Sequence, residues 1–377
     1  MFFDVDHESR VRLEIDMKAL RENFRTVKQY VAPCKVIAIL KANAYGLGVL
    51  PIARALKQAG ADGFGVAELN EALQLVGLGL PIRILGNLLP AEVMPAVNAG
   101  LICPVNDLAM AELLSAEAVR QRRIVYGQLT IDSGMGRLGM LAGRARREIV
   151  AISRLPNLQL TGIYSHCSSA FDGQDPFTVG QVEKMKRLLE ELALDGIGFE
   201  EIHMAASDAL NNFAETRQPP FNCVRAGFNL YGYYDNDVRR SMRLQPVVAL
   251  KTRLAAVRVL PEGYSVGYGR TCVLPRETRV GTIAAGYADG LPLALSNTGA
   301  VLVRGRLCPI LGRLSMDYTT VDLSAVPEAE WGDEVTCIGR DGDRQITLEE
   351  WARLKGTHVY DLLCSFGTRC ARIYVEK

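Results

Sequence analysis

Short apolar runs alternate with amphipathic stretches over the first two thirds of the chain. The run at 36–41 is short and rich in valine and isoleucine, as expected of a strand buried in a parallel sheet. The same pattern recurs, and it predicts strands near 36–41, 63–67, 82–86, 102–105, 126–132, 159–166, 200–205 and 223–230. An opening strand over 11–15 and a helix over about 17–30 precede this series.

The segments between these strands have helical periodicity. They predict helices over 51–60, 70–77, 106–116, 143–154 and 180–194. Eight strand–helix units over roughly 200 residues are typical of an α/β fold with a closed (β/α)8 barrel, as in the TIM barrel. A doubly wound parallel sheet is the alternative, because hydrophobic periodicity does not show whether a sheet closes.

The pattern changes after about residue 244, where turn residues separate short β-rich runs. These runs predict strands over 247–259, 279–285, 300–303, 319–321 and 334–338. One late helix is predicted over 347–354, with Thr347 as its N-cap and Glu350 three residues later. We therefore expect a barrel domain over 1–244 and a mostly β C-terminal domain over 245–377. Whether about the first 12 residues pack with the second domain is left open.

Composition narrows the functional classes. The chain has 377 residues, more than one typical domain, and a net charge of +1, which gives no electrostatic case for nucleic acid or a membrane surface. Nine cysteines occur without a C-x-x-C pair, so neither a disulfide framework nor a metal site is indicated. No signal-peptide core and no run of about 18 apolar residues is present. A cytoplasmic protein with reduced thiols is the expected class.

Lys41 is the most informative residue of the sequence. It ends the first buried run, where an ordinary core position would make an ammonium group costly. An amine at the lip of a strand is well placed to lose its proton and attack a carbonyl. A lysine that merely extends to solvent is the plain alternative, but Tyr45, Gly46 and Gly48 follow closely and favour a functional site.

A glycine motif over 134–139 matches G-x-G-x-x-G, the fingerprint of a dinucleotide-binding turn. No acidic residue ends a second strand about 20 residues later, where ribose recognition requires one. Arg137 lies inside the motif and indicates contact with an anion or a substrate instead. We therefore do not expect a dinucleotide.

In a (β/α)8 barrel, reactive groups lie at the carboxyl ends of the strands. Those ends carry Lys41, Arg137, His166, His203, Ser207 and Arg225. His203 is interpreted as a structural histidine, whereas His166 is better placed for function. Phosphate sites in such barrels use the last loops, which here offer Ser207 and the backbone amides of Gly227 and Phe228. A lysine, a phosphate site and an arginine together indicate pyridoxal 5'-phosphate.

Six motifs resemble the alanine racemases, a family of pyridoxal phosphate enzymes of fold type III. They are AILKANAYG (38–46), DSGMGRLG (132–139), RAGFNLYG (225–232), VGYG (266–269), GYADG (286–290) and GRLSMD (312–317). The resemblance spans nearly the whole chain. It implies an isomerase that interconverts L- and D-alanine and supplies D-amino acids for peptidoglycan.

The resemblance also implies a role for each matching residue. Lys41 would hold the cofactor as a Schiff base and act as one catalytic base. Arg225 would face the pyridine nitrogen, with His166 beside the ring. The phosphate would contact Tyr45, Ser207, Gly227, Phe228 and Tyr360. Arg137 would contact the cofactor and the substrate carboxylate.

The second catalytic base implied by the resemblance is Tyr268, contributed by the other subunit of a homodimer. The backbone of Met316 would help to bind the substrate carboxylate, and Tyr287 would line the entrance. Taken without the resemblance, Tyr268 would be interpreted as a packing residue, and a core position is the alternative for Met316. A surface salt bridge is the alternative for Arg225, but the sequence RAGF (225–228) favours a functional role.

Some positions depart from the family pattern. Thr130 stands where many members have a carbamylated lysine, so either a bound anion fills that place or Arg137 is held differently. Ala206 replaces a common asparagine, and Leu291 follows the GYADG motif where an arginine is common. These differences leave open a broader-specificity or serine racemase. A pyridoxal phosphate decarboxylase and a non-catalytic carrier of the cofactor are the more distant alternatives.

Overall fold

The computed structural model describes residues 9–235 and 239–377. It divides into two compact units, which are described separately. The barrel unit comprises residues 20–245, and the β unit comprises residues 9–19 together with 246–377. Among the described residues, no helix is both long and apolar enough to cross a membrane.

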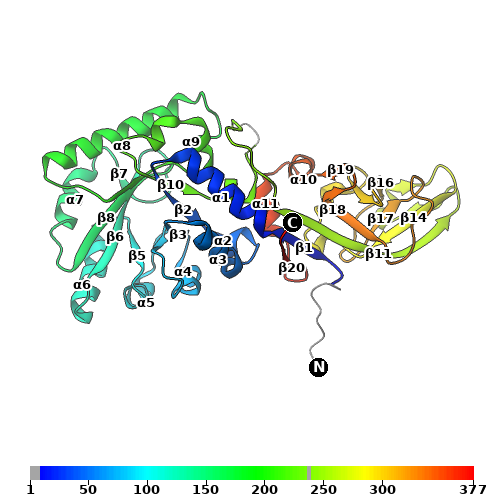
Figure 1. The fold of residues 1–377 in the computed structure, drawn as a ribbon, viewed down its shortest axis with the longest axis horizontal. Coiled ribbons are helices and arrows are strands. Elements are labelled where there is room, and N and C mark those ends of the chain that lie inside the picture. The colour runs from blue at the N-terminus through cyan, green and yellow to red at the C-terminus, as the bar shows by residue number, and fades with distance from the viewer. Residues whose placement is uncertain (1–8, 236–238) are drawn as a thin grey trace. The chain divides into compact units, whose positions relative to one another are not determined.

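The barrel unit contains a closed ring of parallel strands (Figure 1). In ring order the strands are β2 (Lys35–Ile39), β3 (Gly63–Val66), β4 (Ile82–Ile84), β5 (Ile102–Val105), β6 (Val125–Asp132), β8 (Leu158–Tyr164), β9 (Glu201–His203) and β10 (Cys223–Ala226). Arg225 of β10 pairs in register with Ile37 of β2, which closes the ring. The predicted barrel is confirmed, and the doubly wound alternative is wrong.

Helices connect the strands and cover the barrel. They are α1 (Met17–Val31), α3 (Val49–Ala59), α4 (Leu69–Leu75), α5 (Val93–Asn98), α6 (Leu108–Gln121), α7 (Ala145–Ile152), α8 (Pro176–Leu194) and α9 (Ser207–Asn212). Each buries one apolar face; in α3 this face includes Ile52 and Leu56. Asp107 caps α6 by accepting a hydrogen bond from the Met110 N–H over 2.8 Å.

Several strands end earlier than predicted, and two of these ends shape the site. The strand expected over 223–230 ends at Ala226, because the N–H of Gly227 turns to the Ser207 hydroxyl and Phe228–Tyr231 form a 3-10 turn. The first barrel strand ends at Ile39, and Lys41 opens a tight turn, α2 (Lys41–Tyr45). Both ends therefore give way to irregular backbone at the mouth of the barrel.

The β unit is built on one large sheet. Its strands are β1 (Arg12–Asp16), β11 (Val248–Leu260), β14 (Thr278–Ile283), β15 (Ala300–Val303), β16 (Arg306–Leu311), β17 (Thr319–Asp322), β18 (Glu334–Asp341), β19 (Arg344–Ile346) and β20 (Ala371–Val375). Neighbouring strands are antiparallel except β1 and β20, which are parallel. A small hairpin joins β12 (Ser265–Val266) to β13 (Cys272–Val273). The mostly antiparallel second domain is confirmed.

The late helix predicted from its cap is present as α10 (Leu348–Lys355). Thr347 accepts a hydrogen bond from the Glu350 N–H, and the Glu350 carboxylate accepts one from the Thr347 N–H. The expectation of a single late helix is wrong, because α11 (Val359–Ser365) follows. This helix is too short for its hydrophobic period to stand out in the sequence.

Candidate active site

The turn that carries Lys41 has an unusual backbone. Residues 42–45 all have positive φ angles, between 53° and 56°, although none of them is glycine. A left-handed conformation brings Cβ close to the next carbonyl oxygen and costs about 1–2 kcal/mol per residue. Such strain persists only where the surroundings fix it, and it is common at functional sites.

Glu71, in α4, provides part of that fixation. Its carboxylate accepts hydrogen bonds from the backbone N–H of Ala42 and, over 2.8 Å, from that of Ala67. Asn43 accepts a hydrogen bond from the N–H of Val49 over 2.8 Å. The turn beside Lys41 is therefore tied to the neighbouring strand–helix loop and to the start of the next helix.

Arg225 is buried near the carboxyl end of β10, with 4% of its surface exposed. Its Nη1 donates to His203 Nδ1 over 2.6 Å, and its Nη2 donates to His166 Nδ1 over 3.1 Å. Further acceptors are the backbone oxygens of His203, Ser165 and Met204. All five acceptors are uncharged, so the surface salt bridge considered for Arg225 is wrong.

His166 contacts Arg225 and lies within electrostatic range of two more cationic side chains, Arg137 and Lys41. Burial, with a smaller contribution from the charges of Arg225, Arg137 and Lys41, lowers its pKa to about 3. The ring is therefore neutral near pH 7, and its Nδ1 accepts from Arg225. Lys41, Arg137, His166 and Arg225 thus lie at or just beyond the carboxyl ends of four different strands, and the three positive charges all act on His166.

A narrow cradle lies beside this group. The Ser207 hydroxyl accepts from the N–H of Gly227 over 3.2 Å and from that of Asn229 over 3.4 Å. A Cβ on Gly227 would lie 2.6 Å from the Tyr45 hydroxyl, so only glycine fits between these side chains. The ring of Phe228 packs instead against Tyr233, with ring centroids 5.7 Å apart. Any contact of Phe228 with an anion would therefore come from its backbone.

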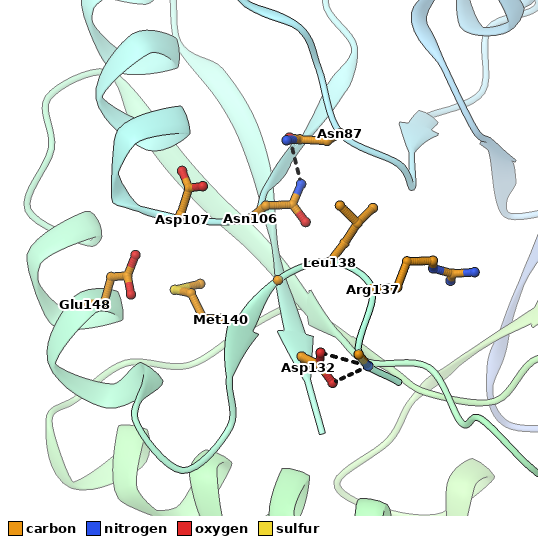
Figure 2. A pocket seen from close by; sticks show the side chains of 10 residues that line it. Asn87, Asn106, Asp107, Asp132, Arg137, Leu138, Met140 and Glu148 are labelled. Atoms are coloured by element: carbon orange, nitrogen blue, oxygen red, sulfur yellow. Dashed lines mark hydrogen bonds between the residues drawn. The ribbon is translucent and has the colours of Figure 1, made fainter. Parts of the chain in front are cut away.

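Arg137 lies in the glycine loop after β6, beside a polar pocket of about 580 Å³ (Figure 2). Asp132 holds the loop by accepting hydrogen bonds from the N–H groups of Gly134 and Gly136, over 2.8 and 2.9 Å. Gly139 has a φ angle of +99°, and a Cβ there would lie 2.5 Å from the Thr130 carbonyl oxygen. The glycines of this motif therefore serve the fold of the loop.

Thr130 donates a hydrogen bond to the Tyr164 hydroxyl over 2.9 Å, and Tyr164 donates to the Leu85 carbonyl oxygen over 3.1 Å. Burial raises the pKa of Tyr164, which keeps the proton on this hydroxyl. The positive charge of Arg137 opposes burial by lowering the pKa of Tyr164, but its effect is the smaller one. A hydroxyl pair thus occupies the neighbourhood for which an anion was considered, and the anion stays a prediction.

The remaining predicted residues belong to the β unit. Tyr268 is 71% exposed and Met316 is 52% exposed. The alternative that these two residues pack in the core is therefore wrong. Tyr287 is also exposed, and its N–H donates to the Ser315 carbonyl oxygen over 3.1 Å. Tyr360 lies in α11, where its ring stacks on His358. Their roles toward a cofactor or a substrate stay predictions.

Arg369 braces the loops that carry Tyr287 and Met316. Its guanidinium binds both carboxylate oxygens of Asp289, over 3.0 and 2.9 Å, and Asp317 over 2.7 Å. Sequence reasoning did not single out Arg369, nor Glu71, nor the contact of His203 with Arg225. Only the position of His203 at a strand end was a usable signal.

Comparisons with known proteins agree with this arrangement. The N-terminal domain model of alanine racemase matches residues 15–235, and the C-terminal domain model matches residues 247–374. Alanine racemase 2 of Caldanaerobacter subterraneus subsp. tengcongensis is 35% identical over 373 residues, covering 97% of this chain and 95% of the relative. The alanine racemase of Symbiobacterium thermophilum is 34% identical, with 98% of both chains covered.

Solved structures give the same result. The alanine racemase of Streptomyces coelicolor superimposes with a TM-score of 0.92 at 31% identity, covering 99% of this chain and 100% of that one. A Bartonella henselae alanine racemase, solved with covalently bound pyridoxal phosphate, gives a TM-score of 0.87 at 30% identity, over 97% of this chain and 100% of that one. This chain belongs to the alanine racemase family.

Proposed function

We propose that the protein is an alanine racemase that uses pyridoxal 5'-phosphate. The observation that carries this proposal is the contact of buried Arg225 with the neutral ring of His166, on which the charges of Arg137 and Lys41 also act. Three cationic groups at one barrel mouth fit an anionic cofactor, and a primary amine among them fits an aldehyde. Family membership and a relative with covalently bound pyridoxal phosphate support the same cofactor.

The residues present fit this cofactor. The cradle of Ser207, Gly227 and Tyr45 offers hydroxyl groups to a phosphate, and the glycine leaves room for the phosphate to approach the backbone, where the Gly227 N–H would exchange its contact with Ser207 for one with the phosphate. Phe228 would add its backbone, and Tyr360 a hydroxyl group. When bound, the cofactor supplies an electron sink that makes the Cα proton of an amino acid acidic.

Arg225 would face the ring nitrogen of the cofactor. Burial lowers its pKa to about 10, which still leaves the guanidinium charged near neutral pH. Because arginine has donors and no acceptor, a ring nitrogen placed against it must accept a hydrogen bond. Arg225 would thus limit electron withdrawal by the ring and suppress side reactions that need a stronger sink.

Inversion at Cα needs proton transfer on two opposite faces. Lys41 would take or return the proton on one face, and Tyr268 of the partner subunit would do so on the other. The high exposure of Tyr268 in the β unit is what a group offered to a second subunit requires. Arg137 and the backbone of Met316 would hold the substrate carboxylate, and Tyr287 would line the entrance.

The proposal is tested by solvent deuterium exchange at Cα with L-alanine, L-serine and L-lysine. Wild type should exchange and invert alanine, and Tyr268→Phe should lose inversion by at least about 100-fold, as expected for a lost general acid–base group. Tyr264→Phe, another exposed tyrosine of the β unit, is the matched control and should keep activity. Exchange without inversion by wild type would contradict the two-base mechanism.

The same panel separates the alternatives. Faster turnover of serine or lysine than of alanine would identify a broader-specificity racemase. Release of carbon dioxide would identify a decarboxylase, and bound cofactor without any turnover would identify a carrier. Sedimentation of the loaded protein should show a homodimer, because the proposed site takes Tyr268 from a second copy.

A further inference from the structure

A chain of buried polar groups leads from Arg225 through the interior of the barrel. Beyond Arg225, His203 Nε2 lies 3.1 Å from Gln128 Oε1. Gln128 Nε2 donates to Glu201 over 2.8 Å. Arg83 then binds both oxygens of Glu201, over 2.8 and 2.6 Å. All five side chains are buried, with at most 7% of any residue exposed.

The groups at the two ends of this series of buried side chains, Arg225 and Glu201, fix the direction of each hydrogen bond between them. Arg225 can only donate, so Nδ1 of His203 must be an acceptor and carries no proton. At the other end, ionised Glu201 can only accept, so Gln128 must donate to it and present its oxygen to His203. His203 is therefore a neutral ring with its proton on Nε2.

Two glycines of the barrel strands leave space for these buried polar side chains. A Cβ on Gly162 of β8 would lie 2.9 Å from the Gln128 amide nitrogen, and one on Gly63 of β3 would lie 2.2 Å from the Arg83 guanidinium. Glycine within a strand weakens the sheet and often marks a place where another group approaches closely. Both glycines here adjoin members of the same polar chain.

The ring of His203 is also held from its face. Tyr164 stacks on it with ring centroids 5.1 Å apart and an angle of 2° between the planes. Gln128 fixes one ring nitrogen, Arg225 meets the other, and Tyr164 fixes the plane of the ring. Rotation of His203 would therefore break several contacts at once.

We infer that His203 is a positioning residue, which orients the Arg225 guanidinium through an acceptor that Gln128, Glu201 and Arg83 hold in place. This inference rests on the proposed function, in which Arg225 faces the ring nitrogen of pyridoxal phosphate. His203 itself touches Arg225 and no reacting atom. Its effect is to fix the direction of the Nη1 bond, and with it the plane of the guanidinium.

The first test observes the histidine tautomers directly. The chain has four histidines, so selective 15N labelling gives few signals, and His203→Asn identifies that of His203 by its loss. Between pH 6 and pH 9 the His203 signal should show a proton on Nε2, none on Nδ1, and no titration. A proton on Nδ1, or on both nitrogens, overturns the inference. This readout needs no activity.

The second test uses two variants that keep different halves of the ring. His203→Asn retains an acceptor near the position of Nδ1, whereas His203→Gln retains a polar group near Nε2. With loaded enzyme, His203→Asn should keep kcat/KM within roughly 10-fold of wild type, and His203→Gln should lose roughly 100-fold, the span seen for outer-shell partners. The absorption spectrum of the bound cofactor should change only in His203→Gln.

Ser115→Ala is the control for stability, because it removes a buried hydrogen bond to Pro156 from α6. It should leave the spectrum and kcat/KM unchanged. Equal losses in the two His203 variants, or a larger loss in His203→Asn, overturn the inference. If wild type binds no pyridoxal phosphate, the proposed function fails, and the tautomer measurement alone then decides whether the chain of hydrogen bonds exists.

Discussion

The carboxylate of Glu71 accepts a hydrogen bond from the backbone N–H of Ala42, the residue directly after Lys41. This contact reaches from α4 to a turn that runs left-handed over residues 42–45. A side chain of one strand–helix unit therefore helps to hold the conformation from which the lysine of the preceding unit emerges.

Loss of this contact should release the turn. We expect Glu71→Ala to lower the free energy of unfolding by about 1.5–3 kcal/mol, the range for a hydrogen bond to a charged group. Urea denaturation measures this loss, and titration with pyridoxal phosphate should show weaker loading. Glu68→Gln changes an exposed neighbour that makes no side-chain cap and should leave both unchanged. Equal behaviour of the two variants would show that Glu71 does not hold the turn.

His166 should make stability depend on pH. Its folded-state pKa of about 3 lies below the value of about 6.5 in the unfolded chain. The unfolded ring therefore takes up a proton as the pH falls below 6.5, while the folded ring stays neutral. The stabilising contribution is complete above pH 6.5 and is lost progressively toward pH 3, with up to about 2 kcal/mol lost between pH 7 and pH 5.

Urea denaturation at pH 5, 6, 7 and 8 measures this effect. His166→Asn should flatten the decline between pH 7 and pH 5, and the buried ring of His203 should account for part of what remains. A decline of the same steepness in wild type and variant would mean that His166 is protonated in the folded protein.

Arg369 offers a test in the β unit. Arg369→Lys keeps the charge and loses the paired contact with Asp289, so the loops with Tyr287 and Met316 should be held less firmly. We expect KM for alanine to rise roughly 10-fold, while the free energy of unfolding changes little because the guanidinium is half exposed and screened by solvent. Arg304→Lys breaks a similar pair with Asp333 and should leave KM unchanged.

Gly227→Ala tests the cradle. The new Cβ would press on the hydroxyl of Tyr45, and overpacking of this kind costs about 1–3 kcal/mol. The double variant Gly227→Ala/Tyr45→Phe should recover part of that stability, because it lacks the hydroxyl oxygen on which the new Cβ presses. Gly180→Ala meets open space on α8 and should be neutral or stabilise by about 0.5–1 kcal/mol. Thermal unfolding of the four proteins compares them.

The sequence predicts the barrel well because its strands are continuous apolar runs, as at 36–41, and each run carries its own signal. Lys41 and His166 could be found from their places at strand ends. The left-handed turn after Lys41 could not, since only Asn43 is of a residue type that favours this conformation, and Ala42 and Ala44 disfavour it. The roles of Glu71 and Gln128 could not be predicted either, because each acts through a partner that is distant in sequence.

The pairing of β1 with both β11 and β20 has a consequence for biosynthesis. The ribosome completes β1 at Asp16 and then adds the whole barrel unit before β11 begins at Val248. The strand must therefore wait, unpaired, while the barrel emerges and folds. Because a waiting edge of this kind invites pairing with other chains, a nascent-chain chaperone acting early would protect this protein most.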